Sequence, residues 1–327
     1  MRLARYLGGG IVEIGDEPAP LCPPGGLLVR TEACGLCSGE LMDWYLDRKV
    51  PHVLGHEVAG IVVESEDDRF PVGARVFPHH HAPCGTCPDC LAGRTVHCRQ
   101  WKSTRLNPGG MAERFAVAAE NLADTWVAGD LRAIDAALIE PLACVEKSLR
   151  KAAVHPHDRV AVIGLGVMGL MHLLCLRARL AVPEAQSVGF DLLDTRRDWA
   201  TRLGLSASAP GPVTGAFDVV VVCPGSAAAL RSALELAAPE ARVVLFAPLP
   251  PSSPVSLDFE ALYFREVQLL PSYSCGPADT EAAIGSLRRG ILRAEDVVSD
   301  FIELDRLPDA YGAMKRGEIL KAMVVFP

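Results

Sequence analysis

The chain has 327 residues, half of them hydrophobic, and a formal net charge of −8. This length exceeds one ordinary hydrophobic core and predicts two domains, while the acidic balance argues against a nucleic-acid partner, which would need a basic face. No apolar run is long enough to span a membrane and no charged-then-apolar leader opens the sequence, so we expect a soluble, cytoplasmic protein without a membrane partner.

The first third of the sequence predicts a compact β-rich domain. Short strands are expected at residues 27–33, 57–65 and 72–77, and Gly and Pro separate them. Before the second strand come a thiol at Cys37 and then the pair His56 and Glu57. A thiolate, an imidazole and a carboxylate are three ligand types that suit Zn²⁺, and three protein ligands leave one position open, as in a catalytic site. The alternative is a buried cysteine and an unrelated surface His–Glu pair.

A second cysteine cluster follows, with the spacing C-x2-C-x2-C-x7-C. Four thiolates so close together predict a closed, structural zinc site, formed by Cys84, Cys87, Cys90 and Cys98. An iron–sulfur cluster or unrelated buried thiols are the alternatives. His79, His80 and His81 precede the cluster, and we expect them to end a strand near the active site rather than to bind metal. The remaining cysteines have no ligand spacing and are expected to be small buried hydrophobes: Cys22, Cys34, Cys144, Cys175, Cys223 and Cys275.

The stretch 133–149 has a helical period and contains Glu140 and Pro141. Glu140 is a carboxylate inside an apolar run, and a buried carboxylate needs a partner. A metal ion, or a water on that ion, would serve; the alternative is an ordinary carboxylate at a helix end.

From His157 onward the pattern alternates strands with helices, as in a doubly wound parallel sheet. A strand, a glycine loop and an apolar helix follow one another, which is the context that a dinucleotide fingerprint requires. The loop residues expected to bind the cofactor are Gly164, Gly166, Val167, Met168 and Gly169.

The next predicted strand ends at Asp191, which is expected to bind the ribose hydroxyls of NAD and to repel the 2′-phosphate of NADP. Arg196 and Arg197 follow it, and Arg196 is included among the expected cofactor-binding residues because an arginine here could favour NADP. NAD is the predicted cofactor.

The last segment contains a predicted helix at 279–290 and a final strand at 321–327, and we expect it to return to the first domain. The predicted domains are therefore 1–146 with 276–327, including a zinc lobe at about 79–100, and 147–275.

Taken together, these motifs resemble those of the zinc-dependent medium-chain alcohol dehydrogenases, and most closely the polyol (sorbitol) and threonine dehydrogenase branch. The resemblance covers essentially the whole chain in order. It implies a GroES-like β-rich catalytic domain joined to a Rossmann domain, so an α/β protein, with two zinc ions per chain and NAD. It also implies that hydride is transferred between NAD and a secondary alcohol or polyol, or the ketone formed from it. The resemblance further implies that the protein is a homodimer or homotetramer.

By position, the resemblance implies that Cys37, His56 and Glu57 bind the catalytic zinc, and that Glu140 binds it directly or through water. The sequence departs from the family at the usual relay Ser or Thr, which is Gly39 here, with Ser38 one place early. The usual Asp that orients the imidazole is replaced by Glu40. These changes fall where substrate would bind, so the substrate cannot be carried over from a relative. We expect Glu140, rather than Ser38, to carry the proton.

Two other functional classes remain as alternatives. One is a zinc-free, NADPH-dependent quinone or enone reductase on the same fold, against which the ligand set argues. The other is a non-catalytic binding protein that keeps the fold, which the missing relay hydroxyl would allow.

Overall fold

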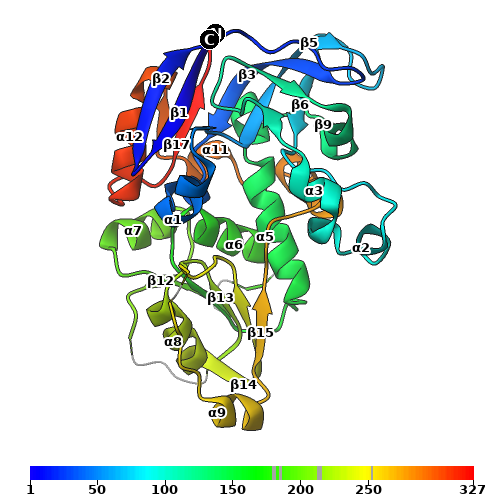
Figure 1. The fold of residues 1–327 in the computed structure, drawn as a ribbon. Coiled ribbons are helices and arrows are strands. Elements are labelled where there is room, and N and C mark those ends of the chain that lie inside the picture. The colour runs from blue at the N-terminus through cyan, green and yellow to red at the C-terminus, as the bar shows by residue number, and fades with distance from the viewer. Residues whose placement is uncertain (179–181, 184–185, 212–215, 252) are drawn as a thin grey trace. The chain divides into compact units, whose positions relative to one another are not determined.

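The computed structural model describes residues 1–178, 182–183, 186–211, 216–251 and 253–327. These residues form two compact units, Met1–Ala143 with Cys275–Pro327, and Cys144–Ser274. The division falls inside helix α5 (Ile139–Lys151). The first unit is mainly antiparallel β-structure and the second contains a parallel sheet, which confirms the predicted α/β class (Figure 1).

The first unit contains two sheets. The smaller has the order β2–β1–β4, with β1 (Arg2–Gly8), β2 (Ile11–Asp16) and β4 (His52–Val53). The larger has the order β16–β17–β3–β5–β6–β9, and β8 pairs with both β3 and β7. Its strands are β3 (Leu27–Gly35), β5 (Glu57–Ser65), β6 (Arg75–Pro78), β7 (Leu106–Asn107), β8 (Arg114–Val117), β9 (Thr125–Val127), β16 (Asp300–Ile302) and β17 (Ala322–Val325).

Short helices connect these strands. The α-helices of this unit before α5 are α1 (Asp43–Leu46), α2 (Pro88–Leu91), α3 (Arg99–Ser103) and α4 (Ala133–Ala136), and those of the last segment are α10 (Pro277–Arg288), α11 (Ala294–Val297) and α12 (Leu307–Lys315). The 3₁₀ turns are η1 (Ser38–Leu41), η2 (Asp47–Lys49), η3 (Thr95–His97), η4 (Ala119–Asp124) and η6 (Leu304–Arg306).

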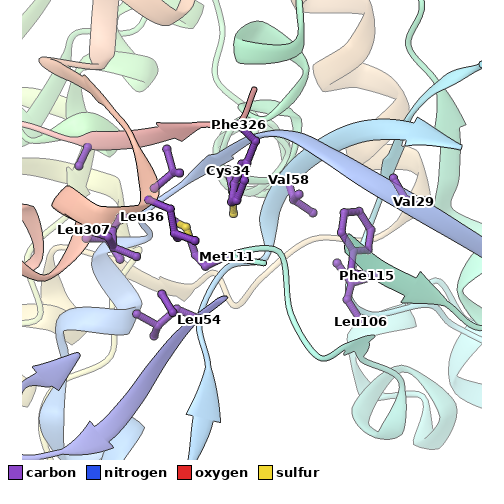
Figure 2. Packing of buried hydrophobic residues seen from close by; sticks show 14 of the residues in the cluster. Val29, Cys34, Leu36, Leu54, Val58, Leu106, Met111, Phe115, Leu307 and Phe326 are labelled. Carbon is purple, nitrogen blue, oxygen red and sulfur yellow. The ribbon is translucent and has the colours of Figure 1, made fainter. Parts of the chain in front are cut away.

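The C-terminal segment returns to the N-terminal sheet, as expected from the sequence. Strand β17 pairs antiparallel with β3, with Val324 opposite Cys34. Figure 2 shows the core beneath this pairing, where Leu36, Leu307 and Phe326 gather although they come from opposite ends of the chain. Burying each such side chain contributes about 1.5–3 kcal/mol, so the two ends of the chain stabilise one common core.

The second unit is a six-stranded parallel sheet with the order β12–β11–β10–β13–β14–β15. Its strands are β10 (Val160–Ile163), β11 (Ser187–Phe190), β12 (Ala207–Ser208), β13 (Phe217–Val222), β14 (Ala237–Leu245) and β15 (Gln268–Pro271). Its helices besides α5 are α6 (Val167–Ala178), α7 (Asp194–Arg202), α8 (Ala227–Leu236) and α9 (Phe259–Phe264). The strand order reverses beside β10, and such a switch point is where open α/β sheets bind ligands.

Two of the predicted elements need correction. The strand expected at 72–77 starts at Arg75, because Gly73 has a φ of +89° and belongs to a turn. The helix expected at 133–149 is divided into α4 and α5. The division falls before Pro141, which lies in the first turn of α5, where a missing N–H costs no hydrogen bond. Of the described helices, none is long and apolar enough to cross a membrane.

Candidate metal and cofactor sites

The predicted catalytic ligands converge at the ends of two paired strands. Cys37 lies two residues after β3 and caps η1, while His56 precedes β5 and Glu57 begins it. The Cys37 Sγ, a ring nitrogen of His56 and a carboxylate oxygen of Glu57 all lie within 4.8 Å of one another. Sulfur, nitrogen and oxygen donors at this separation fit a zinc ion with one position left for substrate.

Glu40 lies behind His56. Its carboxylate is buried, Oε1 accepts a hydrogen bond from the Gly55 N–H at 2.7 Å, and the same oxygen lies 3.4 Å from His56 Nδ1. Burial alone would raise the pKa of Glu40, but His56 and the Gly55 N–H lower it, so this group is a carboxylate. With Nδ1 facing Glu40, Nε2 is the nitrogen that remains for a metal.

Lys321 is part of this site and was missed by sequence reasoning. It lies just before β17, is 1% exposed, forms an ion pair with Glu57 Oε2, and donates to the Leu36 carbonyl at 3.0 Å. Burial would lower the pKa of Lys321, but Glu57 and the Cys37 thiol raise it. A buried carboxylate calls for a partner, but the sequence gives no signal for which residue it is, because Lys321 is 264 positions from Glu57.

Gly35 makes room for this ion pair. It stands opposite Glu57 in the β3–β5 register, and a Cβ at this position would lie 2.3 Å from Glu57 Oε2 and 3.0 Å from Lys321 Cε. The flanking glycine therefore has a definite steric role here: any side chain would displace the carboxylate.

Glu140 is brought to the three-histidine segment that follows β6. It is 6% exposed, and one of its oxygens lies within 4.8 Å of ring nitrogens of both His79 and His80. It is also close enough to help raise the pKa of the Cys37 thiol, which burial raises most. Ser38, the other candidate for the proton, is exposed within η1.

His79 is fully engaged by buried partners. Its Nδ1 lies 2.8 Å from Asp124 Oδ2 and its Nε2 lies 3.6 Å from the Cys275 Sγ. Thr280 donates to the same Asp124 oxygen at 3.2 Å. Cys275 is thus a buried thiol, as are Cys34 and Cys175, whereas Cys22, Cys144 and Cys223, which were also expected to be buried, are partly exposed.

The four cysteines of the second cluster surround a single point. Their Sγ atoms all lie within 4.8 Å of one another, with 3.5 Å from Cys87 to Cys90 and 3.9 Å from Cys84 to Cys90. Tetrahedral Zn–S bonds of about 2.3 Å require sulfur separations of about 3.8 Å, so the cage fits zinc. All eleven cysteines, each of them among the described residues, are free.

Without a cation, the thiols of this cage cannot all ionise together, and their pKa values differ. N–H and hydroxyl groups at Thr86 and the Cys87 N–H lower the pKa of Cys84 to about 6, whereas burial and its neighbouring thiols raise that of Cys90 to about 12. A divalent cation would allow all four to ionise. The other three cage cysteines pack against a very small core, which consists of Cys98 itself with Val96 and Trp101. A structural ion would stabilise this core.

The glycine loop joins β10 to α6 as the fingerprint predicted. Gly164 has a φ of +88°, and a Cβ on Gly169 would lie 1.9 Å from the Gly164 carbonyl oxygen. At Gly166, by contrast, a Cβ would meet nothing within 4 Å. This open space lies at the start of α6, where the first N–H groups of a helix, here those of Val167 and Met168, have no acceptor within the helix. Such a place suits the pyrophosphate of a dinucleotide.

Asp191 follows β11 beside that loop. Its Oδ2 accepts from the Leu165 N–H at 2.7 Å and its Oδ1 from the Leu193 N–H at 2.9 Å. Arg197 donates to the Asp191 carbonyl at 2.7 Å and pairs with Asp194. Burial lowers the pKa of Arg196, which the Asp191 charge partly offsets. The carboxylate is therefore held in place at the loop that would carry the cofactor.

Comparison with known proteins gives consistent results. Residues 23–126 match the family model described as the alcohol dehydrogenase GroES-like domain. The chain is 30% identical to D-altritol 5-dehydrogenase of Agrobacterium fabrum over 289 residues, which is 84% of each protein. It is 26% identical to sorbitol dehydrogenase of Halalkalibacterium halodurans, covering 97% of this chain and 96% of that protein.

Solved structures agree. A crystal structure described as a zinc-binding dehydrogenase of Sinorhizobium meliloti, bound to NADP, has 27% identity and a TM-score of 0.87 over 99% of both chains. A dehydrogenase of Escherichia coli in complex with NADH, at 21% identity and a TM-score of 0.86, shares the fold over 100% of this chain and 99% of its own. This chain belongs to the zinc-dependent medium-chain alcohol dehydrogenase family, in its polyol dehydrogenase branch.

Proposed function

We propose that this protein is a zinc-dependent dehydrogenase that exchanges hydride between a secondary alcohol or polyol and NAD. The proposal depends mainly on the convergence of Cys37, His56 and Glu57, whose sulfur, nitrogen and oxygen ligand atoms lie within 4.8 Å of one another. The named activities of the relatives, D-altritol 5-dehydrogenase and sorbitol dehydrogenase, support a polyol as the substrate class.

When bound, zinc supplies the Lewis acid that favours loss of the hydroxyl proton, and NAD supplies the hydride acceptor. Cys37, His56 and Glu57 would hold the ion, while Glu40 fixes the orientation of the His56 ring. Gly164, Gly166 and Gly169, with the N–H groups of Val167 and Met168, would hold the pyrophosphate. Asp191 and Arg196 would lie at the adenine ribose.

The charge of the proposed metal site depends on Lys321. A thiolate and a carboxylate alone would neutralise a divalent cation, and a second carboxylate at Glu140 would leave the site with a net charge of −1. The Lys321 ammonium, paired with Glu57, adds one positive charge, and the Glu40 carboxylate behind His56 adds one negative charge, so the sum stays at −1. A proton accepted by Glu140 would bring this sum to zero, which suits a carboxylate that takes up the proton of the alcohol.

Metal analysis combined with an alcohol oxidation assay tests the proposal. The unmodified protein should contain two zinc ions per chain and reduce NAD with members of a panel of secondary alcohols, polyols, cyclitols and amino alcohols. Cys37→Ser should lose one zinc and activity while staying folded. Cys22→Ser is a matched control, because Cys22 lies outside both clusters. Zinc-free protein that is active with NADPH on quinones or enones would contradict the proposal.

The homodimer or homotetramer that the resemblance implies stays a prediction, which light scattering of the purified protein would check.

A further inference from the structure

His80 stands out among the three consecutive histidines because its buried Nδ1 has no hydrogen-bond partner among the residues that the structure describes. His79 bonds to Asp124 and contacts Cys275, and His81 Nδ1 lies 3.0 Å from the Thr104 carbonyl oxygen. At His80, Nδ1 is buried, and none of the residues that the structure describes offers it a donor or an acceptor. Buried polar atoms of native proteins are nearly always paired, so an orphan calls for an explanation.

The His80 ring is held beside the proposed catalytic metal ligands. Its centroid lies 4.7 Å from that of His56 and 4.1 Å from that of His81, and it meets His79 edge-on at 4.9 Å. One of its nitrogens is also within 4.8 Å of the Glu140 carboxylate. These three rings restrict the rotation of the His80 side chain, so its ring nitrogens have fixed positions relative to His56.

Burial indicates which ring nitrogen of His80 carries the hydrogen. An unpaired buried N–H is rarer and more costly than an unpaired acceptor. A neutral His80 therefore carries its hydrogen on Nε2 and leaves the buried Nδ1 bare. Because the residue as a whole is partly exposed, Nε2–H is the donor that a bound molecule can reach.

We propose that His80 positions the substrate by donating a hydrogen bond from Nε2 to an oxygen on the carbon next to the reacting one. The inference rests on the proposed function and narrows its substrate to vicinal diols and longer polyols, with the corresponding hydroxyketones in the reverse direction. Hydroxyl and carbonyl oxygens both accept hydrogen bonds, so the contact persists in both directions. A simple secondary alcohol has no such oxygen and would leave the donor unpaired. Sites built to bond a substrate hydroxyl discriminate strongly against analogues that lack it.

A matched pair of substrates, 2,3-butanediol and 2-butanol, tests the proposal. The unmodified holoenzyme should favour the diol in kcat/KM. His80→Phe keeps a flat ring but removes the donor, and should lower kcat/KM for the diol roughly 10- to 100-fold while changing 2-butanol less than about 3-fold. His80→Asn restores a donor and should recover part of the diol preference. His81→Phe is the matched control, and should leave the diol-to-alcohol ratio unchanged.

A binding measurement checks the same contact without turnover. With zinc and NADH present, 2,3-butanediol should raise the melting temperature of the unmodified protein more than 2-butanol does, and His80→Phe should abolish the difference. An unchanged diol-to-alcohol ratio in His80→Phe would overturn the proposal. Loss of zinc from that variant would also overturn it, because His80 would then be a metal ligand. Inactivity of the unmodified holoenzyme on every alcohol would instead count against the proposed function.

Discussion

At the scale of single residues, Asp191 combines two roles in one carboxylate. Each of its oxygens accepts a backbone N–H, one from Leu165 in the glycine loop and one from Leu193. The side chain thus shapes the loop and also places a negative charge where a ribose would lie. A single substitution to alanine would remove both effects together.

Two variants separate these effects. Asp191→Asn keeps a carbonyl oxygen for the Leu165 N–H but removes the charge, so it should raise the NADP-to-NAD ratio of kcat/KM by roughly 10-fold through lost repulsion of the 2′-phosphate. Asp191→Ala should in addition weaken NAD binding. Steady-state kinetics with both cofactors measure the ratio. Equal efficiency of the unmodified enzyme with NAD and NADP would contradict the assignment and point to Arg196.

The proton of the alcohol gives a second prediction at this scale. Gly39 has no hydroxyl, Ser38 is exposed, and Glu140 is a buried carboxylate beside His79 and His80. Glu140→Ala should therefore lower kcat by about 10²- to 10⁴-fold with zinc retained, because a positioned acid–base group is lost. Ser38→Ala should cost little. The reverse pattern, a damaging Ser38→Ala and a silent Glu140→Ala, would assign the relay to the serine.

At the scale of elements, a buried histidine joins α5 to α6. His172 Nδ1 donates to the Met168 carbonyl at 2.6 Å, and its Nε2 lies 2.6 Å from the Ser148 hydroxyl on α5. The ring also meets Phe246 edge-on at 5.0 Å. Burial lowers the pKa of His172 to about 4, so the packing of these two helices requires a neutral ring.

The pH dependence follows from this shift. Between pH 6.5 and about 4, His172 is protonated in the unfolded chain but neutral in the native protein. The free energy of unfolding is therefore highest above pH 6.5 and decreases as the pH falls below that value. From pH 7 to pH 5 the loss is roughly 2 kcal/mol, at about 1.4 kcal/mol per pH unit below 6.5. Urea unfolding at both pH values measures it. His172→Asn should be less stable at pH 7 but lose about 2 kcal/mol less on acidification; equal losses in the two proteins would refute the assignment.

At the scale of the whole molecule, the two proposed zinc ions have different consequences. The four-cysteine lobe packs on a core of only three buried side chains, whereas the Cys37 site lies at the end of a large sheet with its own apolar core (Figure 2). An ion in the lobe would supply folding free energy, and one at Cys37 would supply chemistry.

Cys84→Ser should therefore lower the melting temperature by on the order of 10 °C and promote aggregation, because several kcal/mol of metal binding are lost. Cys37→Ser should lower the melting temperature by less than Cys84→Ser does, since it loses only the stabilisation that ion binding adds while its apolar core is untouched. Scanning calorimetry on zinc-loaded samples makes the comparison. If the two variants melted alike, the division into a structural and a catalytic ion would be wrong.

Much of the architecture could be predicted because its signals are local. The apolar runs of β10 and β13, the glycine loop after β10 and the repeated cysteine spacing all involve residues close together in the chain. The strand at 57–65 was predicted with the bounds that β5 has. The start of the third predicted strand was misplaced because Gly73 belongs to a turn. The stretch at 133–149 was predicted as one helical segment, and the structure divides it into α4 and α5.

The sequence by itself determined the family, the ligand types and the two classes of fold element. Tertiary structure alone decided which distant groups meet: Lys321 pairs with Glu57 across 264 positions because β17 and β5 both border β3. It likewise decided that His79 pairs with Asp124 and Cys275, while the Nδ1 of His80, whose ring lies beside that of His56, meets no hydrogen-bond partner in the described part of the chain. Spacing along a chain reports on local geometry, but the partners of a buried polar group follow from strand register and packing, which bring together residues that no local pattern connects.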